Sequence, residues 1–174
     1  DAPGSDCFDT RARAAACRET LEETGLSISP PDLVSLSLWI PPVQEKRRFS
    51  TRFFVAPAPD APVKIDEGEI HDFRWACPKD IIANTPSPDM VIMPPTYISL
   101  FELSKFTSVD DALAGISGCE DETFETRFIR RDSGFTTLWR PDSAYESGDI
   151  DAPGPRRRLV TTPEKWDYQK DFQL

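Results

Sequence analysis

The sequence has little of the chemistry that thiolate and imidazole metal sites need. It contains one histidine, His71, and four widely spaced cysteines, Cys7, Cys17, Cys77 and Cys119. No Cys-x-x-Cys pair and no cluster of cysteine with histidine occurs, so a structural zinc site is not expected. We expect all four thiols to be reduced, as in a protein of an intracellular compartment.

Long apolar runs and an excess of positive charge are also missing. No apolar stretch approaches the roughly 20 residues that cross a membrane, and no cleavable signal is visible at the start. The net charge of −10 argues against a general nucleic-acid binder, because phosphate backbones normally require a basic surface. We therefore expect an intracellular, soluble protein of the cytoplasm or of a mitochondrial or peroxisomal matrix, with neither a membrane nor a nucleic-acid partner.

What the sequence does have is an acidic stretch that ends at a glycine, from Arg18 to Leu26. Glu19, Glu22 and Glu23 are three and four positions apart, so a helix places them on one face. Such like charges repel one another, and a hard Mg²⁺ or Mn²⁺ ion would remove the repulsion by binding their oxygen atoms. Gly25 suits a C-terminal cap, which needs left-handed backbone. The alternative is a solvated acidic turn without a ligand.

This stretch resembles the core of the Nudix box, R-E-(apolar)-x-E-E-x-G-(apolar), and matches each defined position. The full motif has a glycine fourteen residues before the arginine, where Gly4 stands, and a glutamate six residues after that glycine, where Thr10 stands. The run from Ala2 to Gly4 is similar to the loop that precedes the helix in this family. Asp6 or Asp9 is the alternative acidic residue for the place of Thr10.

The resemblance implies the Nudix fold, an α+β class in which a mixed β-sheet lies between helices as an α/β/α sandwich. It implies that Glu19, Glu22 and Glu23 bind Mg²⁺ or Mn²⁺, and that Glu19 binds the metal or activates water through it. Arg18, Glu19 and Glu22 form the implied catalytic set, in which Arg18 orients the carboxylates. As a purely structural residue, Arg18 would form a surface pair with Glu22 worth only ~0.5 kcal/mol.

The resemblance also bears on the organisation of the chain. The family fold places several strands before the glycine loop, and we expect these strands to be missing here, to be supplied by a protein partner or a homodimer, or to be rearranged. Residues 1–160 are predicted to form the Nudix-like domain, and residues 161–174 a tail with aromatic anchors such as Trp166.

Hydrophobic periodicity and capping residues predict the remaining elements. A first helix is expected from Asp9 or Thr10 to Thr24. The other predictions are strands at 33–40 and 49–56 that form a hairpin, short strands at 63–65 and 71–76, helices at 78–83, 97–106 (capped by Thr96) and 109–116, and a strand at 124–131.

Further runs resemble one Nudix branch, the peroxisomal coenzyme A diphosphatases and their bacterial relatives. Among them are Arg47 to Phe54, with Ser50 in place of the usual aspartate, and Pro94 to Thr96. Arg52 in the first run is expected to bind substrate phosphate; the alternative is that Arg52 and the nearby Lys46, Arg47 and Arg48 only solvate a hairpin.

Three other polar groups have competing interpretations. Glu69, or else Glu67, is expected to assist from a later loop by contacting metal or substrate, and the alternative is an exposed turn. His71 could act in acid–base chemistry but is expected to be structural. The run from Arg156 to Arg158 is expected to be solvated or to face a partner.

Two hypotheses about function follow. The first is an Mg²⁺-dependent Nudix hydrolase that cleaves the diphosphate linkage of a nucleoside diphosphate derivative such as coenzyme A. The second is a catalytically inactive Nudix-like subunit with a structural or binding role in a larger assembly, for example a mitochondrial one. The intact set of Arg18, Glu19, Glu22 and Glu23 favours the first, and Thr10 favours the second.

Overall fold

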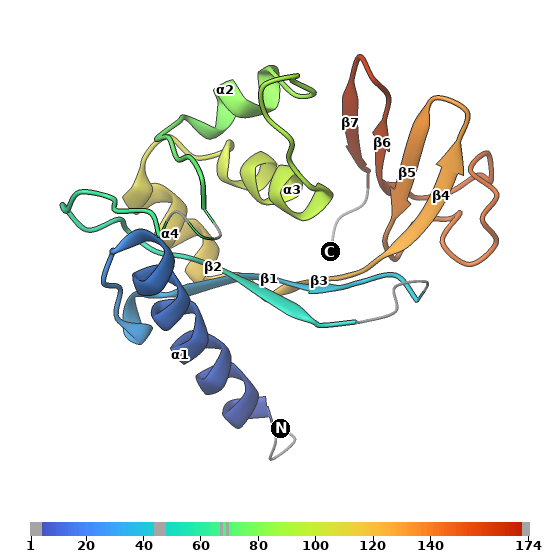
Figure 1. Ribbon diagram of the computed structural model, residues 1–174. Coiled ribbons are helices and arrows are strands. Elements are labelled where there is room, and N and C mark those ends of the chain that lie inside the picture. The colour runs from blue at the N-terminus through green and yellow to red at the C-terminus, as the bar shows by residue number, and fades with distance from the viewer. Residues whose placement is uncertain (1–4, 44–47, 67, 69, 172–174) are drawn as a thin grey trace. The chain divides into compact units, whose positions relative to one another are not determined.

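The computed structural model describes residues 5–43, 48–66, 68 and 70–171 (Figure 1). By its contacts the chain divides into two compact units. Unit 1 consists of Asp1–Leu36, Arg52–Trp75 and Phe106–Asp121, and unit 2 consists of Ser37–Thr51, Ala76–Lys105 and Glu122–Leu174. Both units combine helices with strands, which confirms the expected α+β class. None of the described helices is long and apolar enough to cross a membrane.

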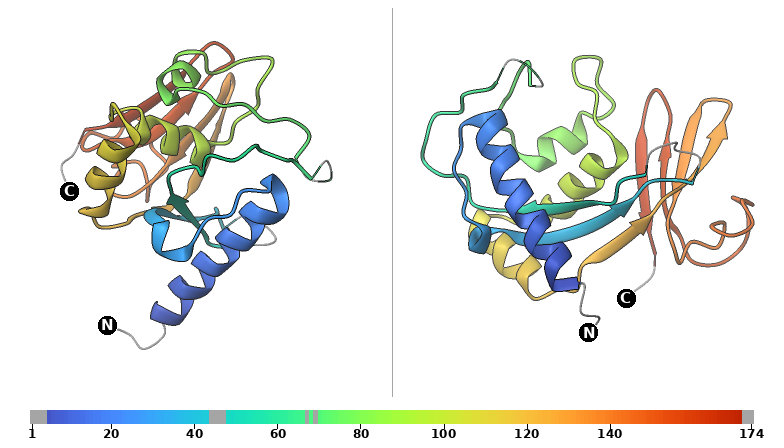
Figure 2. Two further views of the ribbon diagram at one scale, coloured as in Figure 1. Left: turned by 90° about the vertical axis from the view of Figure 1, so that its left-hand side faces the viewer. Right: turned by 60° about the horizontal axis from the view of Figure 1, so that its bottom comes forward.

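Unit 1 contains one long, continuous helix, α1 (Ser5–Thr24), seen from two sides in Figure 2. The helix is rich in alanine, the strongest helix former, and it ends at Gly25, whose φ of 70° is the left-handed cap conformation. The predicted start at Asp9 or Thr10 is wrong, because the helix already begins at Ser5 and both residues lie inside it. The other elements of unit 1 are η1 (Pro30–Asp32), the first part of β1 (Val34–Ile40), most of β2 (Thr51–Val55) and α4 (Val109–Ser117).

Unit 2 contains an antiparallel sheet of order β4-β5-β6-β7. Its strands are β4 (Arg127–Arg131), β5 (Gly134–Leu138), β6 (Arg157–Thr161) and β7 (Trp166–Lys170). A second sheet has the order β2-β1-β3, in which β3 (Glu122–Glu125) runs parallel to the last part of β1. The predicted single strand over 124–131 is therefore wrong. It breaks at Thr126, whose N–H donates to the carbonyl of Ile40 over 2.9 Å, and the chain then enters the other sheet.

The helices of unit 2 agree with the sequence pattern except for the bounds of the helix predicted at 97–106, which differ at both ends. α2 (Pro78–Ala83) has the predicted bounds. α3 (Pro94–Leu103) begins at Pro94, and the predicted cap, Thr96, lies inside its first turn. Proline suits the first helical position because its fixed φ is already helical and its missing N–H would have no partner there. The helix therefore starts two residues before the predicted cap, and its N-cap residue, Met93, makes no side-chain capping hydrogen bond.

Two predicted strands, 63–65 and 71–76, are not strands in the part of the chain that the structure describes. The N–H groups of Lys64 and Asp66 donate to carbonyls of α1 instead of to a strand. The alternation over 71–76 leaves Phe73 and Trp75 exposed. A strand needs a neighbouring strand for its backbone groups, and a local pattern cannot guarantee one.

Three buried aromatic rings of unit 2 pack on one another. The rings of Trp39 and Phe124 are parallel with centroids 4.1 Å apart, and Trp139 meets both edge-on. Such pairs contribute about 0.5–1.5 kcal/mol beyond the area they bury. Strand β7 falls in the predicted tail, and the ring of its Trp166 lies 5.2 Å from the ring of Tyr97 on α3, centroid to centroid. This aromatic residue is thus an anchor within unit 2.

Two arginines of β6 are buried, so the prediction that the run from Arg156 to Arg158 is solvated is wrong for Arg157 and Arg158, each 5% exposed. Arg158 donates two hydrogen bonds to the carboxylate of Asp142, at 2.7 and 2.6 Å. The backbone N–H of Arg157 donates to the same carboxylate at 2.9 Å, and its guanidinium pairs with Glu122. Each buried cation has an acidic partner that no local sequence pattern identified.

Acid is expected to weaken unit 2 through these carboxylates. Burial alone would raise the pKa of Asp142, but hydrogen bonds from Arg158 and from backbone N–H groups bring it below the ordinary value; Lys170 and Arg157 act in the same way on the pKa of Glu122. A carboxyl with a lowered pKa in the folded state stabilises the fold above its unfolded pKa. That stabilisation is lost as pH falls from about 5 through the folded pKa values.

Carbon-detected NMR titration of the two carboxyl groups, in the folded and in the urea-unfolded chain, measures this effect directly. Both groups should titrate at lower pH in the folded chain, and the urea midpoint should fall between about pH 5 and pH 3. Equal titration midpoints in the two states would contradict the prediction.

Candidate active site

The acidic stretch forms the last turns of α1, and its charged side chains face solvent. Those of Arg18, Glu19 and Glu22 are 58%, 56% and 58% exposed. Arg18 donates from Nη1 to Glu22 Oε2 over 2.6 Å and from Nη2 to Glu19 Oε1 over 2.9 Å. Glu23 follows directly and is half-buried. One guanidinium thus holds two carboxylates together beside a third.

The end of α1 is tied to a later segment of unit 1. The N–H of Lys64 donates to the carbonyl of Thr24 over 2.8 Å, and the N–H of Asp66 donates to that of Glu23 over 3.2 Å. These carbonyls have no partner inside the helix because it ends there. A Cβ on Gly25 would lie 3.3 Å from the Cβ of Lys64, so glycine permits this close approach as well as the turn. The acidic turn that starts at Asp66 therefore begins beside the backbone of the last turn of α1.

That turn carries the predicted assisting carboxylates. Glu69, predicted to bind substrate, and its alternative Glu67 lie outside the described residues. Asp66 and Ile70 on either side are joined by a hydrogen bond from the Ile70 N–H to Asp66 Oδ1 of 3.0 Å. His71 is exposed. No sequence signal marks the anchoring of this segment, because backbone N–H groups carry no side-chain signature.

Asp9 and Thr10 lie toward the other end of α1. Gly4 and the side chain of Asp6 are outside the described residues. Thr10 is exposed within the helix. Asp9 accepts a hydrogen bond from Arg13 Nε over 2.6 Å, so its carboxylate already has a cationic partner.

Arg52, predicted to bind substrate phosphate, lies on β2 and points to a different part of α1. Its Nη1 is 2.5 Å from Asp121 Oδ2 and 3.5 Å from Asp9 Oδ1, and its side chain is 19% exposed. Asp9 and Glu19 are ten residues apart, which is about 15 Å along a helix axis. The structure therefore does not bring Arg52 together with the carboxylates of the acidic stretch. Of the other cations named with Arg52, Arg48 is exposed and donates to the carbonyl of Pro41, whereas Lys46 and Arg47 lie outside the described residues.

The donor set on α1 suits a hard divalent cation in its chemistry. Each carboxylate offers two oxygen acceptors, and the exposed Glu19 and Glu22 already gather around one cation, the guanidinium of Arg18. Within the part of the chain that the structure describes, no three histidine, cysteine, aspartate or glutamate side chains converge as a metal site. A metal would thus have to draw these side chains away from Arg18, which their exposure allows.

Comparisons with known proteins agree on one superfamily. The family model described as "NUDIX domain" matches residues 9–94. This range contains the acidic stretch of α1, the acidic turn that starts at Asp66, and the strands β1 and β2. Acyl-coenzyme A diphosphatase NUDT19 of Gallus gallus is 27% identical to the chain over 146 residues, which is 76% of this chain and 38% of that protein. The chain thus spans 38% of the length of this curated relative. No solved structure matches the chain.

Proposed function

We propose that this chain, which carries a Nudix domain and resembles the coenzyme A diphosphatase branch of the Nudix hydrolases, is a hydrolase dependent on Mg²⁺ or Mn²⁺. Its substrate would be a nucleoside diphosphate derivative, either coenzyme A or a similar molecule, cleaved at the diphosphate linkage. The observation that carries the proposal is the contact of Arg18 with both Glu19 and Glu22 on an exposed helix end, with Glu23 beside them.

The reaction requires that the negative charge of the phosphate group be neutralised while water attacks its phosphorus atom. A bond from a water oxygen to phosphorus forms, the bond from phosphorus to the bridging oxygen breaks, and the water loses a proton. A bound divalent ion would neutralise phosphate oxygens and activate the water. Glu19, Glu22 and Glu23 would hold that ion through their oxygens, and Glu19 could alternatively take up the proton. Arg18 would keep Glu19 and Glu22 oriented before the ion binds.

The test is a titration of the purified chain with Mg²⁺ and with Mn²⁺, while phosphate-containing products are measured. The substrate panel contains coenzyme A, NADH, ADP-ribose and nucleoside triphosphates. We expect turnover of at least one diphosphate derivative that requires the metal and stops on addition of a chelator. Metal binding without turnover of any member of the panel would contradict the proposal, as would turnover that is indifferent to the chelator.

The alternative hypothesis, a subunit without catalysis, has no support from the comparisons, because the matched relative carries the name of an enzyme. The expected location, in the cytoplasm or in an organelle matrix, remains a prediction, and so does completion of the fold by a partner or a second copy.

A further inference from the structure

Arg52 belongs to a polar network that joins four segments of unit 1. Its Nη1 donates to Oδ2 of Asp121, the residue just before β3, and to Oγ of Ser35 on β1 over 3.2 Å. Ser35 Oγ donates to the same Asp121 oxygen over 2.6 Å. The guanidinium of Arg52 also lies 5.9 Å from the centre of the ring of Phe8 on α1. These contacts fix the direction of the Arg52 side chain.

The network reaches α1 through Asp9. One oxygen of Asp9 is 3.5 Å from Arg52, and the other accepts from Arg13 Nε over 2.6 Å. Arg13 in turn donates from Nη1 to the carbonyl of Leu33 over 2.5 Å and lies 5.1 Å from the ring of Phe54 on β2. Both guanidinium groups therefore attach the helix to the segment that leads into β1 and to β2.

The charges of this network balance internally. Two guanidinium groups, Arg13 and Arg52, face two carboxylates, Asp9 and Asp121, and the four side chains are 19–34% exposed. A phosphate that approached Arg52 would meet both carboxylates at contact distance, and like charges at such distances repel. Arg52 is also directed to a point about 15 Å along the helix from Glu19.

We infer that Arg52 is a positioning residue: through Asp9 and Asp121 it holds α1 in place, and it does not bind the phosphate of the substrate. The expected effect on turnover rests on the proposed function. The attachment of α1 does not, because it can be measured by hydrogen exchange without any activity. A helix displaced by about 1 Å can lower a rate up to 10²-fold, since the reacting groups must be aligned.

The experiment compares Arg52→Gln, Asp121→Asn and the double variant. Arg11→Gln, which removes an exposed charge from α1, is the matched control. Arg52→Lys keeps the charge but not the planar fork of donors. Its exchange rates, urea midpoint and kcat should lie between those of wild type and of Arg52→Gln, and this graded result distinguishes a weakened network from a general folding defect. The measurements are hydrogen exchange of the α1 amides, the urea midpoint, and kcat and KM for the substrate found in the panel.

We expect both single variants to speed exchange across α1 and to lower kcat by roughly 10-fold or more, with KM within about 2-fold of wild type. In the double variant, α1 exchange and kcat should change no more than in the more affected single variant, because the two substitutions break the same network. A KM that rises about 10-fold in Arg52→Gln but not in Asp121→Asn would overturn the inference, as would additive midpoint shifts. If the wild type shows no turnover, the proposed function fails, and exchange and midpoints alone decide whether Arg52 holds α1.

Discussion

Replacement of Glu22 by glutamine is expected to lower metal-dependent turnover by at least ~10³-fold. Charge stabilisation by a metal is worth several kcal/mol in a phosphoryl transition state, and each 1.36 kcal/mol is a factor of ten. The amide keeps the size of the side chain but loses the charge that binds the ion. Because Glu22 is 58% exposed and paired only at the surface, the free energy of unfolding should change by no more than about 0.5 kcal/mol.

Steady-state kinetics with calorimetric metal titration checks this expectation, and Glu23→Gln should behave in the same way. Glu164→Gln, an exposed change of the same type in unit 2, is the matched control and should keep wild-type turnover. Turnover of Glu22→Gln within about 3-fold of wild type would remove Glu22 from the catalytic set and would favour the interpretation of the acidic stretch as a solvated turn.

Replacement of Asp142 by asparagine is expected to destabilise the chain by about 3–5 kcal/mol, the usual loss when one partner of a buried ion pair is removed. The Asp142 side chain is 0% exposed and that of Arg158 is 6% exposed, so solvent cannot replace the missing charge. The new amide group would in addition place a donor against donors of Arg158 or of the backbone N–H groups of Arg157 and Ala144.

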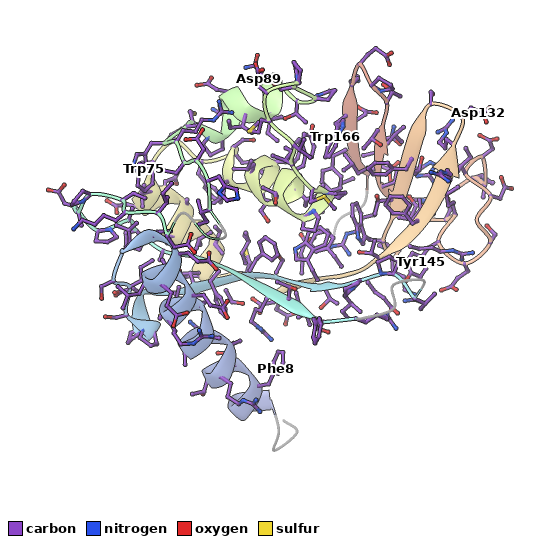
Figure 3. All side chains as sticks on the ribbon, viewed as in Figure 1. Phe8, Trp75, Asp89, Asp132, Tyr145 and Trp166 are labelled. Atoms are coloured by element: carbon purple, nitrogen blue, oxygen red, sulfur yellow. The ribbon has the colours of Figure 1, made fainter. Side chains whose placement is uncertain are left out.

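Urea denaturation of Asp142→Asn beside Asp132→Asn, an exposed aspartate in the turn between β4 and β5, isolates the effect of burial (Figure 3). The control should stay within about 0.5 kcal/mol of wild type. A combined Asp142→Leu and Arg158→Met variant should recover part of the lost stability, because both charges are then removed and neither is left buried without a partner. An equal, small effect of both aspartate substitutions would show that the ion pair contributes little.

Local chemistry was enough to predict the features that depend on neighbouring residues in the chain. The acidic helix and its glycine end followed from spacing and from the backbone freedom of Gly25, and Arg18 meets Glu22 because side chains four positions apart share a helical face. The strand Val34–Ile40 and the helix Pro78–Ala83 likewise carry their own periodicity and end signals.

Partners that are distant in sequence had no such signal. Nothing near Arg52 in the chain predicts that Asp121 and Asp9 would occupy its guanidinium, and nothing near Arg158 predicts Asp142. The segment at Lys64 was predicted as a strand but gives its backbone hydrogen bonds to the end of α1. The sequence by itself therefore determined the carboxylate-bearing helix, because that helix rests on local spacing, and it implied the α+β class through the resemblance to the Nudix family. Only the tertiary structure decided which charges are buried, since burial depends on which distant segments supply the compensating charge and the hydrogen bonds.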